Sequence, residues 1–89
     1  MEPFFSIIVP VYNRPQEVDE LSGSLCTQTV TDFEVIIVED GSSIPCEAVC
    51  QCYANRLNIR YFAKSNSGPG LSRNYGAESA QGAYLLILD

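Results

Sequence analysis

The chain has 89 residues, 46% of them hydrophobic and 18% charged, which is the composition of a folded globular protein rather than a disordered one. Its 5 basic and 11 acidic residues give a net charge of −6, which argues against binding to nucleic acid or to an anionic membrane surface. No apolar run approaches the roughly 18 residues of a membrane-spanning helix, and the N-terminus lacks the pattern of a signal peptide. We therefore expect a cytoplasmic protein, which could work at the inner face of the membrane through other parts of a longer chain.

Short apolar runs rich in β-branched residues alternate with segments whose apolar residues have helical spacing. In chain order, the predicted elements are a strand at Phe5–Val11, a helix at Pro15–Thr29, a strand at Phe33–Glu39, a helix at Pro45–Asn55, a strand at Ile59–Ala63, a helix at Gly70–Gln81 and a strand at Ala83–Leu88. Asn13 is the expected cap of the first helix, Pro45 is expected in the first turn of the second, and Gly82 is expected to end the third.

This order predicts an α/β fold, in which a Rossmann-like βαβαβαβ arrangement forms a mostly parallel four-stranded sheet with helices on both faces. No linker or repeat interrupts the pattern, so residues 1–89 are expected to form a single domain. Right-handed crossovers bring the carboxyl ends of the strands to one edge of the sheet.

The four cysteines are expected to be ordinary packing residues. Cys46 and Cys50 are four residues apart and can share one face of a helix, and Cys52 follows closely. The chain has no histidine and no paired cysteine knuckles, which argues against a zinc site. A disulfide framework is not expected without a secretory signal.

Polar residues follow the first two predicted strands, at the edge where α/β sheets bind ligands. Tyr12 offers a flat face that can stack on a planar ring. Glu39 and Asp40 are adjacent, so one side chain should turn toward the loop, where a carboxylate can accept hydrogen bonds from a ribose hydroxyl or a base N–H. A purely structural role remains open for each loop. Tyr12 could serve only in packing, and Glu39 and Asp40 could simply belong to an acidic turn.

The last two strands lead to an arginine and an acid. Arg73 lies one turn into the predicted third helix, where a guanidinium and a helix N-terminus suit an anionic group, although a solvated surface arginine remains an alternative. Asp89 ends the last predicted strand. A carboxylate there can hold a divalent metal, Mg²⁺ or Mn²⁺, but such cations usually need a second carboxylate.

Four stretches together carry a family resemblance: Ser6–Asn13, Phe33–Ser43, Asn66–Gly76 and Gly82–Asp89. In this order and spacing the chain resembles the N-terminal part of a family 2 glycosyltransferase with the GT-A fold, over essentially all 89 residues. The resemblance implies an inverting transfer of a sugar from a nucleoside diphosphate donor, commonly UDP-linked, in the synthesis of a glycan or cell-envelope polysaccharide. The acceptor of the full-length protein would be a glycan or a lipid-linked molecule.

The resemblance also implies roles for individual residues. Pro10, Val11 and Tyr12 would frame the base, Asp40 would bind the base or ribose, and Asn66, Gly68 and Arg73 would lie near the diphosphate or the wall of the donor pocket. Asp89 would be the first acid of the family's Asp-x-Asp metal motif, whose remainder does not follow in this sequence. Glu39 stands where many members carry Asp. The acceptor-binding part that supplies the catalytic base is missing as well, so no catalytic residue is predicted, and the 89-residue chain is expected to bind donor without transferring sugar.

Two other interpretations stay open. A nucleotidyltransferase also grips a nucleotide on a related sheet, but it should carry a glycine-rich basic loop after its first strand, where this chain has Tyr12-Asn13-Arg14-Pro15. A truncated, non-catalytic protein is the second alternative. The last strand should lie beside the first and leave an open apolar edge, so self-association through that edge is predicted.

Overall fold

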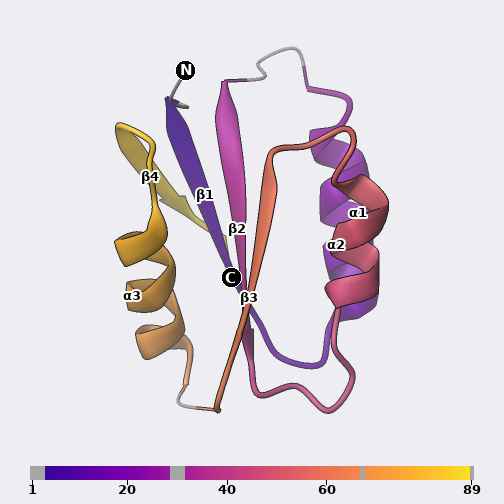
Figure 1. Cartoon of the computed structure of the whole chain (residues 1–89), viewed down its shortest axis with the longest axis vertical. Coiled ribbons are helices and arrows are strands. Elements are labelled where there is room, and N and C mark those ends of the chain that lie inside the picture. The colour runs from indigo at the N-terminus through magenta and orange to yellow at the C-terminus, as the bar shows by residue number, and fades with distance from the viewer. Residues whose placement is uncertain (1–3, 29–31, 67, 89) are drawn as a thin grey trace.

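The computed structural model describes residues 4–28, 32–66 and 68–88, and it contains seven elements in the predicted order (Figure 1). They are β1 (Phe5–Val11), α1 (Pro15–Leu25), β2 (Phe33–Asp40), α2 (Glu47–Tyr53), β3 (Ile59–Lys64), α3 (Pro69–Ser79) and β4 (Tyr84–Ile87). Within these described ranges, the helices are too short to cross a bilayer.

The four strands form one parallel sheet in the order β3-β2-β1-β4. Figure 1 shows α1 and α2 on one face of the sheet and α3 on the other, which confirms the predicted fold class. The core has two layers because neighbouring strand residues point to opposite faces. One layer includes Ile7, Val9 and Ile37 and packs under α1 and α2, and the other contains Ile8, Ile36 and Val38.

The chain order explains where a ligand site should form. From β1 the chain adds β2 and then β3 on one side, and it then crosses the other face through α3 to add β4 on the opposite side of β1. The strand order therefore reverses between β1 and β4. In open α/β sheets, ligands bind beyond the carboxyl ends of the strands at such a reversal.

Three predictions about helix ends were wrong. α1 has Arg14 as its N-cap residue, and Asn13 instead accepts hydrogen bonds through its side chain from the neighbouring loop. α2 begins at Glu47, so Pro45 lies before the helix. α3 ends at Ser79, and Gly82 is needed because a Cβ there would lie 2.7 Å from the backbone nitrogen of Ser6 on β1.

The cysteines lie on or beside the helices. Cys46 and Cys50 are buried in the layer under α1 and α2, as their spacing predicted, whereas Cys52 is exposed. Hydrogen bonding to Cys50, together with burial, raises the pKa of the Cys46 thiol, so this group is protonated at neutral pH. It therefore contributes to packing as a small apolar side chain.

A buried ion pair ties α3 and β4 to the amino-terminal end of the sheet. Glu34 on β2 is completely buried, and its carboxylate accepts bonds from Arg60 Nη2 at 2.6 Å, from the Ser6 hydroxyl at 2.6 Å and from the Gln81 N–H at 2.6 Å. Arg60 also donates to the Ser79 carbonyl at the end of α3. The network thus links β1, β2 and β3 to the end of α3 and to the segment between α3 and β4.

β4 forms an exposed edge, and we expect the isolated 89-residue chain to self-associate through it. Its side chains and Leu88 are between 40% and 58% exposed, although all five are apolar or aromatic. An apolar strand edge pairs readily with another chain. Sedimentation velocity at rising concentration should show dimers or larger species, which Leu86→Lys should reduce. A monomer at all concentrations would contradict this prediction.

Candidate functional site

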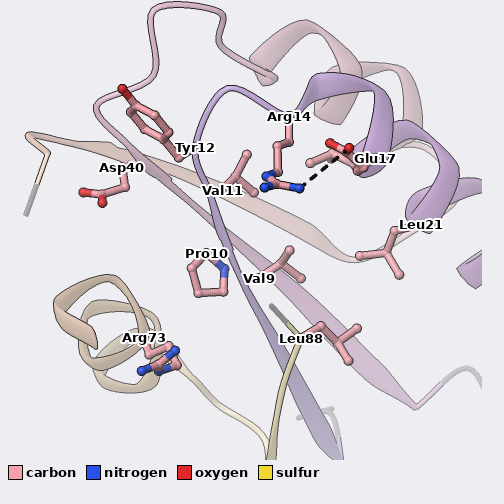
Figure 2. A pocket seen from close by; sticks show the side chains of 11 residues that line it. Val9, Pro10, Val11, Tyr12, Arg14, Glu17, Leu21, Asp40, Arg73 and Leu88 are labelled. Carbon is pink, nitrogen blue, oxygen red and sulfur yellow. Dashed lines mark ion pairs between the residues drawn. The ribbon is translucent and has the colours of Figure 1, made fainter. Parts of the chain in front are cut away.

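A cleft of about 700 Å³ lies at the carboxyl end of β1, where the strand order reverses. Its walls come from β1, α1, α3 and the ends of β2 and β4, and they consist of Val9, Pro10, Val11, Tyr12, Arg14, Glu17, Val18, Leu21, Asp40, Arg73 and Leu88. The lining is apolar along β1 and α1, with charged groups placed around it (Figure 2). This combination is typical of small-molecule sites.

Pro10 lies at the point where β1 stops pairing with β4. The Leu88 N–H donates to the Ile8 carbonyl at 2.9 Å, so the main chain of Pro10, two residues further on, faces the same side. Proline has no N–H to continue the ladder with β4. The pairing of β1 with β4 therefore ends beside the cleft, whereas the register of β1 with β2 continues as far as Val11 and Glu39.

Five of the predicted donor-binding residues line this cleft: Pro10, Val11, Tyr12, Asp40 and Arg73. Figure 2 shows Tyr12 and Asp40 together at one end, and Arg73 reaching the cleft from α3. Tyr12 is 52% exposed, so its ring is accessible to a planar ligand. The cleft thus combines an accessible aromatic ring, a carboxylate and a guanidinium.

The last residue of β3 and the loop between β3 and α3 form hydrogen bonds to Asp40. Its carboxylate accepts hydrogen bonds from Lys64 Nζ at 3.0 Å and from the Gly68 N–H at 3.0 Å, and its carbonyl accepts one from the Asn66 amide at 3.2 Å. Gly68 has a φ of 95°, which favours glycine there. Asn66 and Gly68 were predicted beside the donor, but here they contact Asp40 and are absent from the lining of the cleft in the described chain.

Glu39 braces the loops that carry Tyr12 and Asp40. It is 2% exposed and accepts hydrogen bonds from Ser42 Oγ at 2.5 Å, from the Cys46 N–H at 2.7 Å and from the Tyr61 hydroxyl at 2.9 Å. Ser42 in turn accepts the Asn13 N–H at 2.8 Å. The two adjacent acids therefore differ in role. Glu39 stabilises the loops that follow β1 and β2 through its hydrogen bonds, whereas Asp40 lines the cleft.

Burial and hydrogen bonding act in opposite directions on Glu34 and Glu39. Burial alone would raise the pKa of each, but the hydrogen bonds that both receive hold the pKa below its ordinary value of 4.5. Burial and the neighbouring Glu39 carboxylate raise the pKa of Tyr61, so its hydroxyl remains a donor. Both glutamates are therefore ionised at neutral pH.

Acid should destabilise the fold through these two carboxylates. Because their pKa values are lower in the folded chain than in the unfolded chain, their stabilisation is present above about pH 4.5 and is lost as the pH falls through the folded values. Urea unfolding between pH 7 and pH 3.5 should show a free energy of unfolding that falls on the acid side. Glu39→Gln should flatten this dependence, and a stability that rises toward pH 4 would contradict the assignment.

Sequence reasoning missed Lys64, Arg14 and Glu17. Lys64 pairs with Asp40 in the register of β2 and β3, so aligning the ends of these strands would have revealed it. Arg14 brings a second guanidinium to the cleft, and its Nη1 lies 3.8 Å from Oε1 of Glu17 at the exposed start of α1. The orientation of α1 that brings both to the cleft has no clear signal in the sequence.

The described residues do not make a divalent-metal site in the cleft. Its two described carboxylates, Asp40 and Glu17, are paired with Lys64 and Arg14, and the described ranges contain no cluster of three or more candidate ligands. Asp89, the predicted metal ligand, lies outside the described residues.

Comparisons with known proteins agree with this geometry. Residues 6–89 match the family model described as glycosyl transferase family 2. An uncharacterized glycosyltransferase of Rickettsia felis is 39% identical over 94% of this chain and 14% of its own length. TarS of Staphylococcus aureus, a poly(ribitol-phosphate) beta-N-acetylglucosaminyltransferase, is 36% identical over 96% of this chain and 16% of its own. The chain spans between 10% and 26% of the length of the curated relatives it matches.

Solved structures show the same fold. The crystal structure of S. aureus TarS residues 1–349 matches 97% of this chain and 27% of that one, with a TM-score of 0.89 and 37% identity. The structure of the same TarS segment in complex with UDP-GlcNAc matches with a TM-score of 0.88 and 37% identity, over 97% of this chain and 26% of that one. The family model, the fold and the cleft agree, and the chain belongs to glycosyl transferase family 2.

Proposed function

We propose that the protein containing this chain transfers a sugar from a nucleoside diphosphate donor, with UDP as the nucleotide, to an acceptor hydroxyl, and that this chain supplies the donor-binding part. The observation that carries the proposal is the cleft at the strand reversal, which brings Tyr12, Asp40 and Arg73 together. The TarS complexes with UDP-GlcNAc and with UDP support it, because that protein has the same fold over this region.

Each group suits one part of such a donor. The exposed ring of Tyr12 can stack on the base. The Asp40 carboxylate can accept a hydrogen bond from a base N–H or a ribose hydroxyl. The guanidinium of Arg73 suits the diphosphate, since its planar set of donors binds phosphate oxygens in pairs.

The transfer is a direct displacement at the anomeric carbon. The acceptor oxygen forms a bond to that carbon as the bond to the diphosphate oxygen breaks, which inverts the configuration. The departing diphosphate takes the electron pair, and Arg73 would stabilise its charge. The acceptor proton passes to a base outside the described residues. The predicted divalent metal would depend on Asp89.

The acceptor is proposed from the relatives. The name of TarS refers to poly(ribitol-phosphate). The minor teichoic acid biosynthesis protein GgaB of Bacillus subtilis is 37% identical over 96% of this chain and 10% of its own length, and its name refers to teichoic acid. A glycan or lipid-linked acceptor in cell-envelope polysaccharide synthesis therefore suits the whole protein, working from the cytoplasmic side of the membrane.

Calorimetry on the intact protein tests the donor proposal. UDP and UDP-GlcNAc, each with and without Mn²⁺, should release binding heat and compete for one site. Sugar transfer, followed as UDP release, should require an added acceptor. No heat with either nucleotide at millimolar concentration would contradict the donor assignment.

A further inference from the structure

We propose that Lys64 is a positioning residue that acts through Asp40 to select the base of the nucleotide donor; this inference rests on the proposed function. The selected class would be bases that present an N–H donor to the carboxylate, such as uracil, over bases that present an acceptor there, such as cytosine.

Lys64 is placed to act on Asp40 and is unusually well buried for a lysine. The two residues are register partners at the carboxyl ends of β3 and β2, and the Lys64 side chain is only 16% exposed. Lysines are mostly exposed, because burying an ammonium is costly unless it is paired. Lys64 Nζ donates to Asp40 Oδ1 at 3.0 Å and to the Ser65 carbonyl at 2.8 Å, which fixes the ammonium behind the carboxylate.

The second carboxylate oxygen is fixed as well. Asp40 Oδ2 accepts the Gly68 N–H, so rotation of the carboxylate would break contacts with both Lys64 and Gly68. The Asp40 side chain is 7% exposed and belongs to the wall of the cleft. A base that enters the cleft therefore meets a carboxylate whose orientation is fixed by its hydrogen bonds to Lys64 and Gly68.

The Lys64 ammonium also forms an ion pair with this carboxylate, with 3.0 Å between Nζ and Oδ1. An ionised carboxylate only accepts hydrogen bonds. It can bind the ring N–H of uracil, whereas the ring nitrogen at the same position of cytosine is itself an acceptor and would be repelled. Buried polar groups left without a partner discriminate strongly between ligands. Lys64 would therefore contribute to base selection without touching the base.

The test measures dissociation constants of UDP and CDP for the intact protein by calorimetry. Lys64→Met should weaken UDP binding roughly 5- to 20-fold, as expected for coupled neighbours, and change CDP binding little, so the preference for UDP shrinks. Lys64→Arg should restore much of the preference. In an Asp40→Asn background, Lys64→Met should have little further effect on UDP binding. Lys64→Gln gives a second test of the same prediction if Lys64→Met fails to fold.

The outcomes separate this inference from the proposed function. If Lys64→Met lost UDP and CDP affinity equally, Lys64 would have a general structural role, which would overturn the inference. The same holds if Lys64→Met weakened UDP binding as much in the Asp40→Asn background as in the unmodified protein. Unchanged UDP binding in Lys64→Met would also overturn it, while leaving donor binding intact. Failure of the unmodified protein to bind UDP would instead overturn the proposed function itself.

Discussion

Arg60→Met is expected to lower the free energy of unfolding by about 3 kcal/mol, because it leaves the buried Glu34 carboxylate without its cation. Glu34 is completely buried, and Arg60 binds it through both Nε and Nη2. Breaking a buried ion pair from one side costs roughly 3–5 kcal/mol. We expect a loss at the lower end of this range, because the Arg60 side chain is 31% exposed and water can take over part of its interaction with Glu34. Urea unfolding followed by circular dichroism measures the loss.

Arg56→Met is the matched control. Arg56 lies over the ring of Tyr53, with its guanidinium carbon 4.9 Å from the ring centre, and it is exposed in the turn that follows α2. The same change of side chain there should cost far less stability. Equal losses in the two variants would show that the Glu34 network contributes no more than an ordinary surface contact.

Tyr12→Ala is expected to weaken UDP binding roughly 5- to 160-fold, since stacking of a base on an aromatic ring contributes about 1–3 kcal/mol. The ring is half exposed at one end of the cleft, so its loss should change the stability of the fold little. Stacking uses the flat face that every base has, so CDP should lose affinity by a similar factor. Calorimetry with both nucleotides measures the effect.

Tyr12→Phe and Tyr75→Ala are the controls. Tyr12→Phe keeps the ring and should retain most of the affinity. Tyr75 is another partly exposed tyrosine, but its ring packs against Phe62, so Tyr75→Ala should leave the affinity unchanged. Tyr12→Ala with wild-type affinity would remove Tyr12 from the donor site.

The strands and the way they alternate with helices along the chain could be predicted from the sequence because the signal is local. Residues 35–38 in the middle of β2, Val-Ile-Ile-Val, are apolar and β-branched, and burial on both faces of a parallel sheet favours that pattern. Helix ends were less predictable because tertiary contacts decide them. Asn13 could have capped α1, but its side chain contacts the Ser43 hydroxyl and the Ile44 N–H, which lie about 30 residues away in the chain.

Part of the lining of the cleft could be predicted for a related reason. The carboxyl ends of parallel strands converge, so Tyr12 and Asp40 were expected to meet, and both line the cleft. Lys64 was missed because a lysine after a short strand looks like a solvated charge until the register with β2 is known. Asn66 and Gly68 were expected near the donor; in the structure both bind Asp40, and their place beside a donor stays a prediction.

Amide chemical shifts during a UDP titration would show whether the cleft at the carboxyl end of β1 binds the nucleotide of the donor. If it does, the largest shifts are expected at Val11, Tyr12, Asp40 and Arg73, with small shifts on α2 and on the outer part of β3. Shifts centred on α2, or no shifts at millimolar UDP, would contradict binding at this cleft.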